Sequence, residues 1–111
     1  MKGTYLGEFE ELVLLTVAVL YEEAYGIAIK KEMEERLERS VSVGALQSAL
    51  ARMEKKSYLS SRLGDATPER GGKRKRYYTV TPAGYKVLRE TKETRLQLWN
   101  AIPRLAFDFS Q

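Results

Sequence analysis

Apolar residues recur every three or four positions near the start of the chain. Between residues 8 and 22 they are Phe9, Leu12, Val13, Val17 and Leu20. This spacing predicts a helix with one apolar face, and the glutamates at positions 8, 10 and 11 complement the dipole of its first turn. β-Branched residues in the same stretch leave a buried strand as the alternative. The acidic start and the length of the segment favour the helix.

The next helix is predicted over residues 25–39. A break at residues 23–26 precedes it, and Ile29, Met33 and Leu37 follow at intervals of four. These three residues form one apolar stripe, while charged residues occupy the opposite side. This helix is therefore expected to bury one face and to expose the other.

A third helix is predicted over residues 43–56, with an inward stripe of Leu46, Leu50 and Met53. Ser42 lies directly before it and is a predicted N-cap, because its hydroxyl can accept a hydrogen bond from a free N–H group of the first turn. Small and polar side chains occupy the outward face of this helix, toward solvent or a partner.

Two strand-like stretches, residues 58–63 and 76–81, flank a loop that contains two glycines. Short strands joined by such a loop indicate a β-hairpin. Tyr77 and Tyr78 point to opposite faces of the second strand, so one of them is expected to pack in the core.

A fourth helix is predicted from Pro82 to about Ala101, with Thr81 as its N-cap. Its apolar residues are Tyr85, Leu88, Leu96, Trp99 and Ile102. A polar stretch, residues 89–95, interrupts them, so this helix cannot be fully buried in its own monomer and is expected to pack on a second subunit. The apolar tail, residues 105–109, is expected to dock rather than to fray.

Composition narrows the possible functions. The chain has 111 residues, which suit one domain, and contains neither Cys nor His. This excludes disulfides and removes the commonest general base and the commonest metal ligands. We therefore expect no cofactor, no metal and no enzymatic activity. The longest apolar run, residues 12–20, is too short to cross a membrane and follows acidic residues unlike a signal peptide, so we expect a cytoplasmic protein.

Charge is distributed unevenly along the chain. Residues 8–38 hold nine acids and three bases, whereas residues 70–89 hold seven bases and no acid. Five of those bases lie in residues 70–76, in the hairpin loop. A solvated loop would account for the charge alone, but a basic hairpin beside a helix pair is typical of a nucleic-acid surface. The order of the predicted elements, three helices, two strands and a fourth helix, predicts a mainly α fold with a small two-stranded β-hairpin.

The chain resembles the PadR-type bacterial transcriptional regulators, which have a winged helix-turn-helix fold. The resemblance covers roughly residues 5–90 and rests on four motifs in order. The motifs are Leu6-Gly7-Glu8, Ala24-Tyr25-Gly26-Ile27, Val43-Gly44-Ala45-Leu46 with residues 50–56, and residues 76–84 (Arg-Tyr-Tyr-Thr-Val-Thr-Pro-Ala-Gly). It implies a homodimeric DNA-binding regulator, usually a repressor. Residues 1–81 would form the DNA-binding part and residues 82–111 the dimerisation helix and tail of one compact unit.

Candidate DNA-binding residues follow from this reading. The third predicted helix would be the recognition helix, and its candidates are Ser42, Gly44, Ala45, Gln47, Ser48 and Arg52. The predicted hairpin with its loop would be the wing, and the candidates on the wing and the second helix are Lys73, Arg74, Lys75, Arg76 and Tyr25. Wing cations are expected to contact phosphate, with one side chain entering the minor groove, although Arg76 could instead brace the hairpin. Gln47 or Ser48 is expected to reach DNA, where Gln47 either makes a base contact or weakens a phosphate contact. Arg52 is expected to reach a phosphate, and Tyr25 either a phosphate or the core.

The candidate dimer interface comprises Phe9, Leu88, Leu96, Trp99 and Ile102. Trp99 either packs there or walls a pocket for a small-molecule effector, since family ligands tend to lie near the subunit interface. Gln47 and Ser57 depart from the family, which often has Tyr and Gly there. Ser57 suggests a turn that needs less φ freedom than glycine provides. The alternative function is a winged-helix protein-interaction module that does not bind DNA and docks through its tail.

Overall fold

The computed structural model describes residues 6–65 and 74–110. The regular elements are α1 (Glu8–Leu20), the 3₁₀ turn η1 (Tyr21–Glu23), α2 (Gly26–Leu37), α3 (Val43–Lys55), β1 (Leu59–Leu63), β2 (Arg76–Val80), α4 (Pro82–Ala101) and the 3₁₀ turn η3 (Arg104–Phe107). This order confirms the predicted fold class. The first predicted helix is divided, because Tyr21 takes a positive φ of 53° and ends α1.

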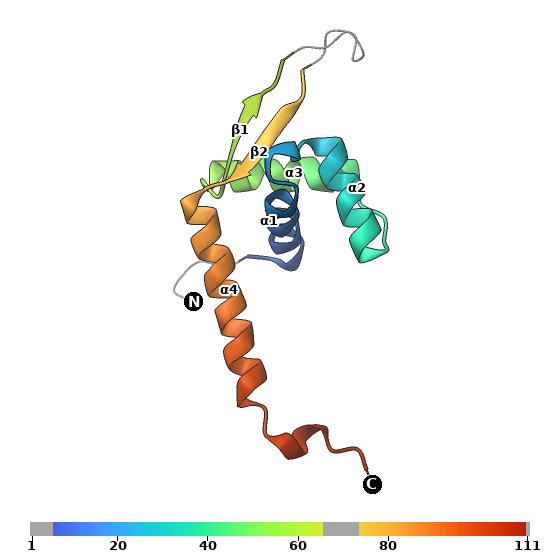
Figure 1. Ribbon diagram of the computed structural model, residues 1–111, viewed down its shortest axis with the longest axis vertical. Coiled ribbons are helices and arrows are strands. Elements are labelled where there is room, and N and C mark those ends of the chain that lie inside the picture. The colour runs from blue at the N-terminus through green and yellow to red at the C-terminus, as the bar shows by residue number, and fades with distance from the viewer. Residues whose placement is uncertain (1–5, 66–73, 111) are drawn as a thin grey trace.

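Helices α1 to α3 and the hairpin form a small globular head, and the C-terminal part of the chain extends from it (Figure 1). Helix α1 lies at the centre, α2 and α3 pack on it, and the hairpin projects at the end of the molecule opposite the C-terminus. Helix α4 leaves the head and carries the C-terminal residues away from it. The molecule measures 64 × 31 × 21 Å along its principal axes, and its length reflects this extension.

The hairpin is tied to the head through its second strand. β1 and β2 pair antiparallel, with Leu59 opposite Val80 and Leu63 opposite Arg76. The Tyr78 N–H donates to the Ala24 carbonyl at 2.8 Å, on the side of β2 away from β1. Tyr78 is buried and Tyr77 only half-buried, which confirms that one of the two packs in the core.

The core surrounds α1 on several sides. Val13, Leu14 and Val17 are fully buried, whereas the predicted Phe9, Leu12 and Leu20 are only half-buried against the core. The inward side of α1 carries Glu10, Val13, Leu14 and Val17, and the opposite side is exposed. One inward face is therefore confirmed, but the predicted stripe lies partly to one side of it. The predicted stripes of α2 and α3 are confirmed, with Leu37 half-buried at the end of α2.

Both predicted N-caps are present. The Ala45 N–H donates to Ser42 Oγ at 3.2 Å, and the Gly84 N–H donates to Thr81 Oγ1 at 3.0 Å. These bonds satisfy otherwise free N–H groups at the starts of α3 and α4. The starts of α3 and α4 are thus set by local sequence.

The prediction about Ser57 was wrong. Ser57 has φ 68°, in the left-handed region. Its N–H donates to the Glu54 carbonyl at 3.0 Å, and the Tyr58 N–H donates to the Met53 carbonyl at 2.8 Å. This pair of bonds is a Schellman motif, which usually places glycine at the left-handed position. The turn needs the freedom of glycine and holds serine at a conformational cost.

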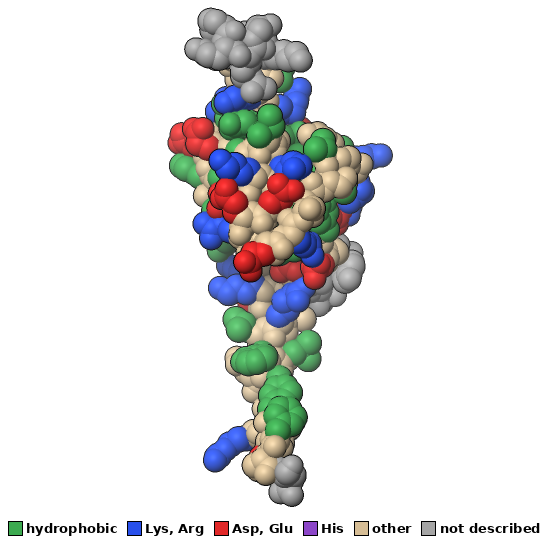
Figure 2. All heavy atoms as spheres, turned by 90° about the vertical axis from the view of Figure 1, so that its right-hand side faces the viewer, with side chains coloured by type: hydrophobic (Ala, Val, Ile, Leu, Met, Phe, Trp, Pro, Cys, Tyr) green, Lys and Arg blue, Asp and Glu red, His purple; other side chains and the backbone are tan. Residues whose placement is uncertain are grey.

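Helix α4 begins against the core and ends in solvent. Gly84, Val87 and Thr91 are buried, and Leu88 is half-buried against the core. From Leu96 onward the apolar side chains are mostly exposed: Leu96 45%, Leu98 69%, Trp99 66%, Leu105 77%, Phe107 57% and Phe109 83%. We call residues 92–110 the arm. Figure 2 shows hydrophobic side chains gathered along it, whereas charged side chains of both signs cover the head.

The predicted docking of the tail does not occur within the single chain. The rings of Trp99 and Phe107 lie 6.4 Å apart, and those of Phe107 and Phe109 lie 6.3 Å apart. The tail thus folds back on the end of α4 but stays exposed to water. No helix among residues 6–65 and 74–110 has both the length and the apolar character needed to cross a membrane.

Ser57→Gly is expected to stabilise the fold by about 1 kcal/mol, because it relieves a left-handed non-glycine residue. Urea unfolding monitored by circular dichroism measures this change. Ser57→Ala is the matched control and should give no gain, since alanine keeps the Cβ that causes the strain. Equal stability of the wild type and the glycine variant would contradict the interpretation.

Candidate nucleic-acid interface

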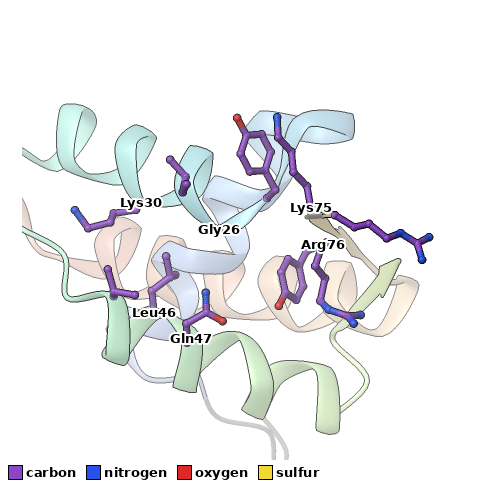
Figure 3. Close-up of a pocket in the computed structure, with 11 residues that line it drawn as sticks. Gly26, Lys30, Leu46, Gln47, Lys75 and Arg76 are labelled. Atoms are coloured by element: carbon purple, nitrogen blue, oxygen red, sulfur yellow. The ribbon is translucent and has the colours of Figure 1, made fainter. Parts of the chain in front are cut away.

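A hollow of about 300 Å³ opens on the head between α2, α3 and the hairpin (Figure 3). Its lining comprises Tyr25, Gly26, Ile27 and Lys30 from the start of α2, Val43, Leu46 and Gln47 from α3, and Arg74, Lys75, Arg76 and Tyr78 from the hairpin. The structure therefore brings together the start of the predicted recognition helix and the described part of the basic wing.

The first turns of α3 present small side chains to solvent. Ser42, Gly44, Ala45 and Ser48 are all exposed beside the hollow. A Cβ added to Gly44 would meet only Ser42 Oγ, at 3.8 Å, so nothing in the fold itself requires glycine there. Because these side chains are small, another molecule can approach the backbone of α3 closely.

Gln47 lies over the start of α2. A Cβ added to Gly26 would be 3.3 Å from Gln47 Nε2, so the glycine leaves room for this side chain. Figure 3 shows Gln47 pointing from α3 toward Gly26, with Lys75 and Arg76 across the hollow. Within residues 6–65 and 74–110 the Gln47 amide has no hydrogen-bond partner. Its donor and acceptor are both free to bind a ligand.

The wing cations are held by uncharged groups. Arg74 Nε donates to the Gly64 carbonyl at 2.7 Å, and Arg76 Nη1 donates to Ser61 Oγ at 3.0 Å. The Lys75 ammonium lies 4.1 Å from the centre of the Tyr25 ring. The Arg76 bond joins the two strands of the hairpin through one N–H group, and contact of this side chain with phosphate stays a prediction. Lys73 lies outside the described residues.

Most other described cations near the head are neutralised by glutamate. Arg52 Nε lies 3.0 Å from Glu10 Oε2, and Lys56 Nζ lies 3.7 Å from Glu10 Oε1. In the part of the chain that the structure describes, Arg74, Lys75 and Arg76 have no such ion pair. The positive charge of the wing is thus left for an external anion. Arg52 links α3 to α1, and its contact with phosphate stays a prediction.

Aromatic contacts lead from Tyr25 at the hollow, through Tyr77 of β2, to Arg62 of β1. The Tyr25 and Tyr77 rings meet edge to face at 5.6 Å, and the Arg62 guanidinium lies 4.9 Å from the Tyr77 ring. Tyr25 is half-buried and also lines the hollow, so it combines features of both predicted roles. Burial, with a smaller effect of the Glu54 carboxylate, raises the pKa of Tyr78, which keeps this hydroxyl neutral.

Residues 14–90 match the sequence profile of the transcriptional regulator PadR-like family. The chain belongs to this family. PadR-like proteins are DNA-binding transcription regulators and not enzymes. The family resemblance and the prediction that the protein is not an enzyme are both confirmed. A search of curated proteins finds no match.

Solved structures of PadR-like regulators have the same fold. A PadR family regulator from Eggerthella lenta is 27% identical over 91% of this chain and 88% of its own, with a TM-score of 0.69. One from Clostridium difficile is 29% identical over 80% of this chain and 91% of its own, with a TM-score of 0.62. A transcriptional regulator from Clostridium thermocellum is 25% identical over 85% of this chain and 92% of its own, with a TM-score of 0.65.

Sequence reasoning missed Glu34, which holds the turn between α2 and α3 in this PadR-like chain. Glu34 Oε2 accepts the Val41 N–H at 2.9 Å and contacts Lys30 Nζ at 3.1 Å. The Lys30–Glu34 spacing was visible as a helical pair, but the bond to Val41 arises only when the chain turns. Val41 is followed at once by Ser42, so Glu34 helps to position the start of α3.

Glu34→Gln is expected to lower the stability of the regulator near neutral pH and much less at acidic pH. The Val41 N–H, and then Lys30, hold the pKa of Glu34 below its ordinary value of 4.5. Its stabilising effect is therefore complete above that value and is lost as the pH falls through the lowered pKa. Urea unfolding of both proteins at pH 7 and pH 3 tests this.

Glu35→Gln is the matched control, because Glu35 is an exposed neighbour on the same helix. Its effect on the free energy of unfolding should be small at both pH values. A stability difference between wild type and Glu34→Gln that stays constant from pH 7 to pH 3 would contradict the assigned role.

Proposed function

We propose that this PadR-like regulator is a homodimeric, sequence-specific repressor that binds a palindromic operator in the cytoplasm. The observation that carries the proposal is the hollow, where the exposed start of α3 and three cations without acidic partners lie on one face. Such a face can place a helix in the major groove and cations on the flanking phosphates. Repression as the sign of control is inferred from the family resemblance.

In this arrangement Gln47 and Ser48 approach the base edges, while Ser42, Gly44 and Ala45 let the helix come close. Arg74, Lys75 and Arg76, together with Lys73, contact the sugar-phosphate backbone, and one of them enters the minor groove. Tyr25 contributes a further phosphate contact at the edge of the hollow. Phosphate contacts supply affinity that depends on salt, whereas base contacts supply the choice of sequence.

Replacing Arg74 and Lys75 together by alanine is expected to weaken binding to all duplexes alike. The slope of log affinity against log salt should fall in magnitude by about 2, because each lost phosphate contact removes about one unit. Fluorescence anisotropy with an operator and with unrelated DNA, over a series of salt concentrations, measures both quantities.

Lys86→Ala with Lys92→Ala is the matched control, since it removes the same charge from exposed positions of α4. Its salt slope should change much less. If the protein showed salt-dependent affinity that wing and control variants reduced equally, net charge rather than the wing would explain binding. If it showed no affinity for any duplex, the protein-interaction alternative would replace the proposal.

The proposed dimer is formed by the arm. Leu96 and Trp99 are exposed there, and Ile102 is half-buried at the end of α4. A second copy would cover these residues, together with the parts of Phe9 and Leu88 that the head leaves accessible. Burial of this apolar surface would drive the pairing. The paired arms would hold two α3 helices for half-sites about one helical turn apart.

Leu96→Glu combined with Trp99→Ser is expected to give a monomer at micromolar concentration. Affinity for a two-half-site operator should fall about a hundredfold or more, because the two heads no longer bind as one unit. Light scattering gives the mass, and anisotropy gives the affinity.

Tyr21→Ser is the control, because Tyr21 is 74% exposed and lies on the head rather than on the arm. It should leave the mass unchanged. A wild type that is monomeric at micromolar concentration would remove the dimer proposal. A small-molecule effector walled by Trp99 at this interface remains a prediction.

A further inference from the structure

We propose that Val43 and Ile27 contact thymine methyl groups, and that Gln47 binds an adenine close to them. The half-site would then carry A·T pairs where α3 enters the major groove. This inference rests on the proposed function of α3 as the recognition helix, and it adds the chemical identity of the bases.

Val43 and Ile27 are exposed aliphatic residues on an otherwise polar and cationic face. Val43 is 59% exposed and Ile27 is 66% exposed, and both line the hollow. Neither belongs to the buried core or to the residues packed on it. Val43 begins α3 and Ile27 lies in the first turn of α2, so two apolar side chains from different helices border one opening.

The major groove offers one apolar group on a base edge, the C5-methyl group of thymine. An aliphatic side chain placed there gains contact with that methyl. Opposite cytosine it would instead cover an amino group without accepting its hydrogen bond, which is unfavourable. Val43 and Ile27 therefore favour thymine.

Gln47 follows Val43 by four residues, which places both on one face of α3. Its amide has no partner among the described residues and points into the hollow. A free glutamine amide can bind adenine N6 and N7 with two hydrogen bonds. Four helical residues rise about 6 Å, so Gln47 and Val43 reach base pairs about two steps apart.

The same turn lacks the side chains that read guanine. Residues 42–48 contain neither Arg nor Lys, although these are the residues that bind the guanine edge in the major groove. Lys30 also borders the hollow but is paired with Glu34. The chemistry available at the start of α3 is thus aliphatic, amide and hydroxyl, which suits A·T pairs.

The test replaces thymine by uracil, which removes only the methyl group. The full chain first selects bound fragments from genomic DNA, and each thymine of the selected half-site is then changed singly. At two positions the wild type should lose about three- to tenfold in affinity. At one of these positions Val43→Ala should bind the thymine and uracil duplexes equally, and Ile27→Ala should do so at the other.

Both residues are exposed, so the alanine variants should keep the fold, which circular dichroism checks. Val43→Thr is a conservative variant that keeps one methyl group and should retain part of the thymine preference. If wild-type binding is sensitive to salt but indifferent to every uracil replacement, the inference is wrong and the proposed function stands. Uracil sensitivity that persists in both alanine variants also overturns it. If no duplex binds, the proposed function fails as well.

Discussion

The contact between the turn after α3 and the start of α4 determines how the whole molecule can work. Thr81 Oγ1 donates to the Ser57 carbonyl at 2.5 Å, and the Thr81 N–H donates to the Tyr58 carbonyl at 3.1 Å. A Cβ added to Gly84 would lie 2.2 Å from the Tyr58 oxygen, so only glycine allows this approach. The junction fixes the angle between α3 and the arm. In a dimer, that angle would decide where the two recognition helices lie.

Charge is organised around the same arrangement. The acidic α1 lies at the centre, where Glu10 pairs with Arg52 of α3 and Glu11 pairs with Arg95 of α4 at 2.8 Å. These pairs neutralise cations that face the head. Arg74 and Lys75 meet a carbonyl and an aromatic ring instead. The positive charge of the described wing residues is therefore not compensated by a carboxylate. The uneven distribution of charge along the sequence thus persists in the folded structure.

Local features of the fold could be predicted from the sequence. The helices over residues 26–37, 43–55 and 82–101 depend on apolar spacing and on caps such as Ser42 and Thr81. These signals act between residues three or four positions apart, so neighbouring residues suffice to establish them. The motifs also placed the chain in the PadR-like family, which the profile match confirmed.

The tertiary structure decided what each exposed side chain faces. The left-handed Ser57, the bond from Val41 to Glu34 and the burial of Leu14 all depend on elements meeting in space. Spacing cannot separate a lysine paired with glutamate from one left free beside a ring, because that difference depends on residues brought together by packing. By itself the sequence determined the helices, the hairpin and the basic wing. Only packing around α1 decided which charged and apolar groups of the described residues stay exposed.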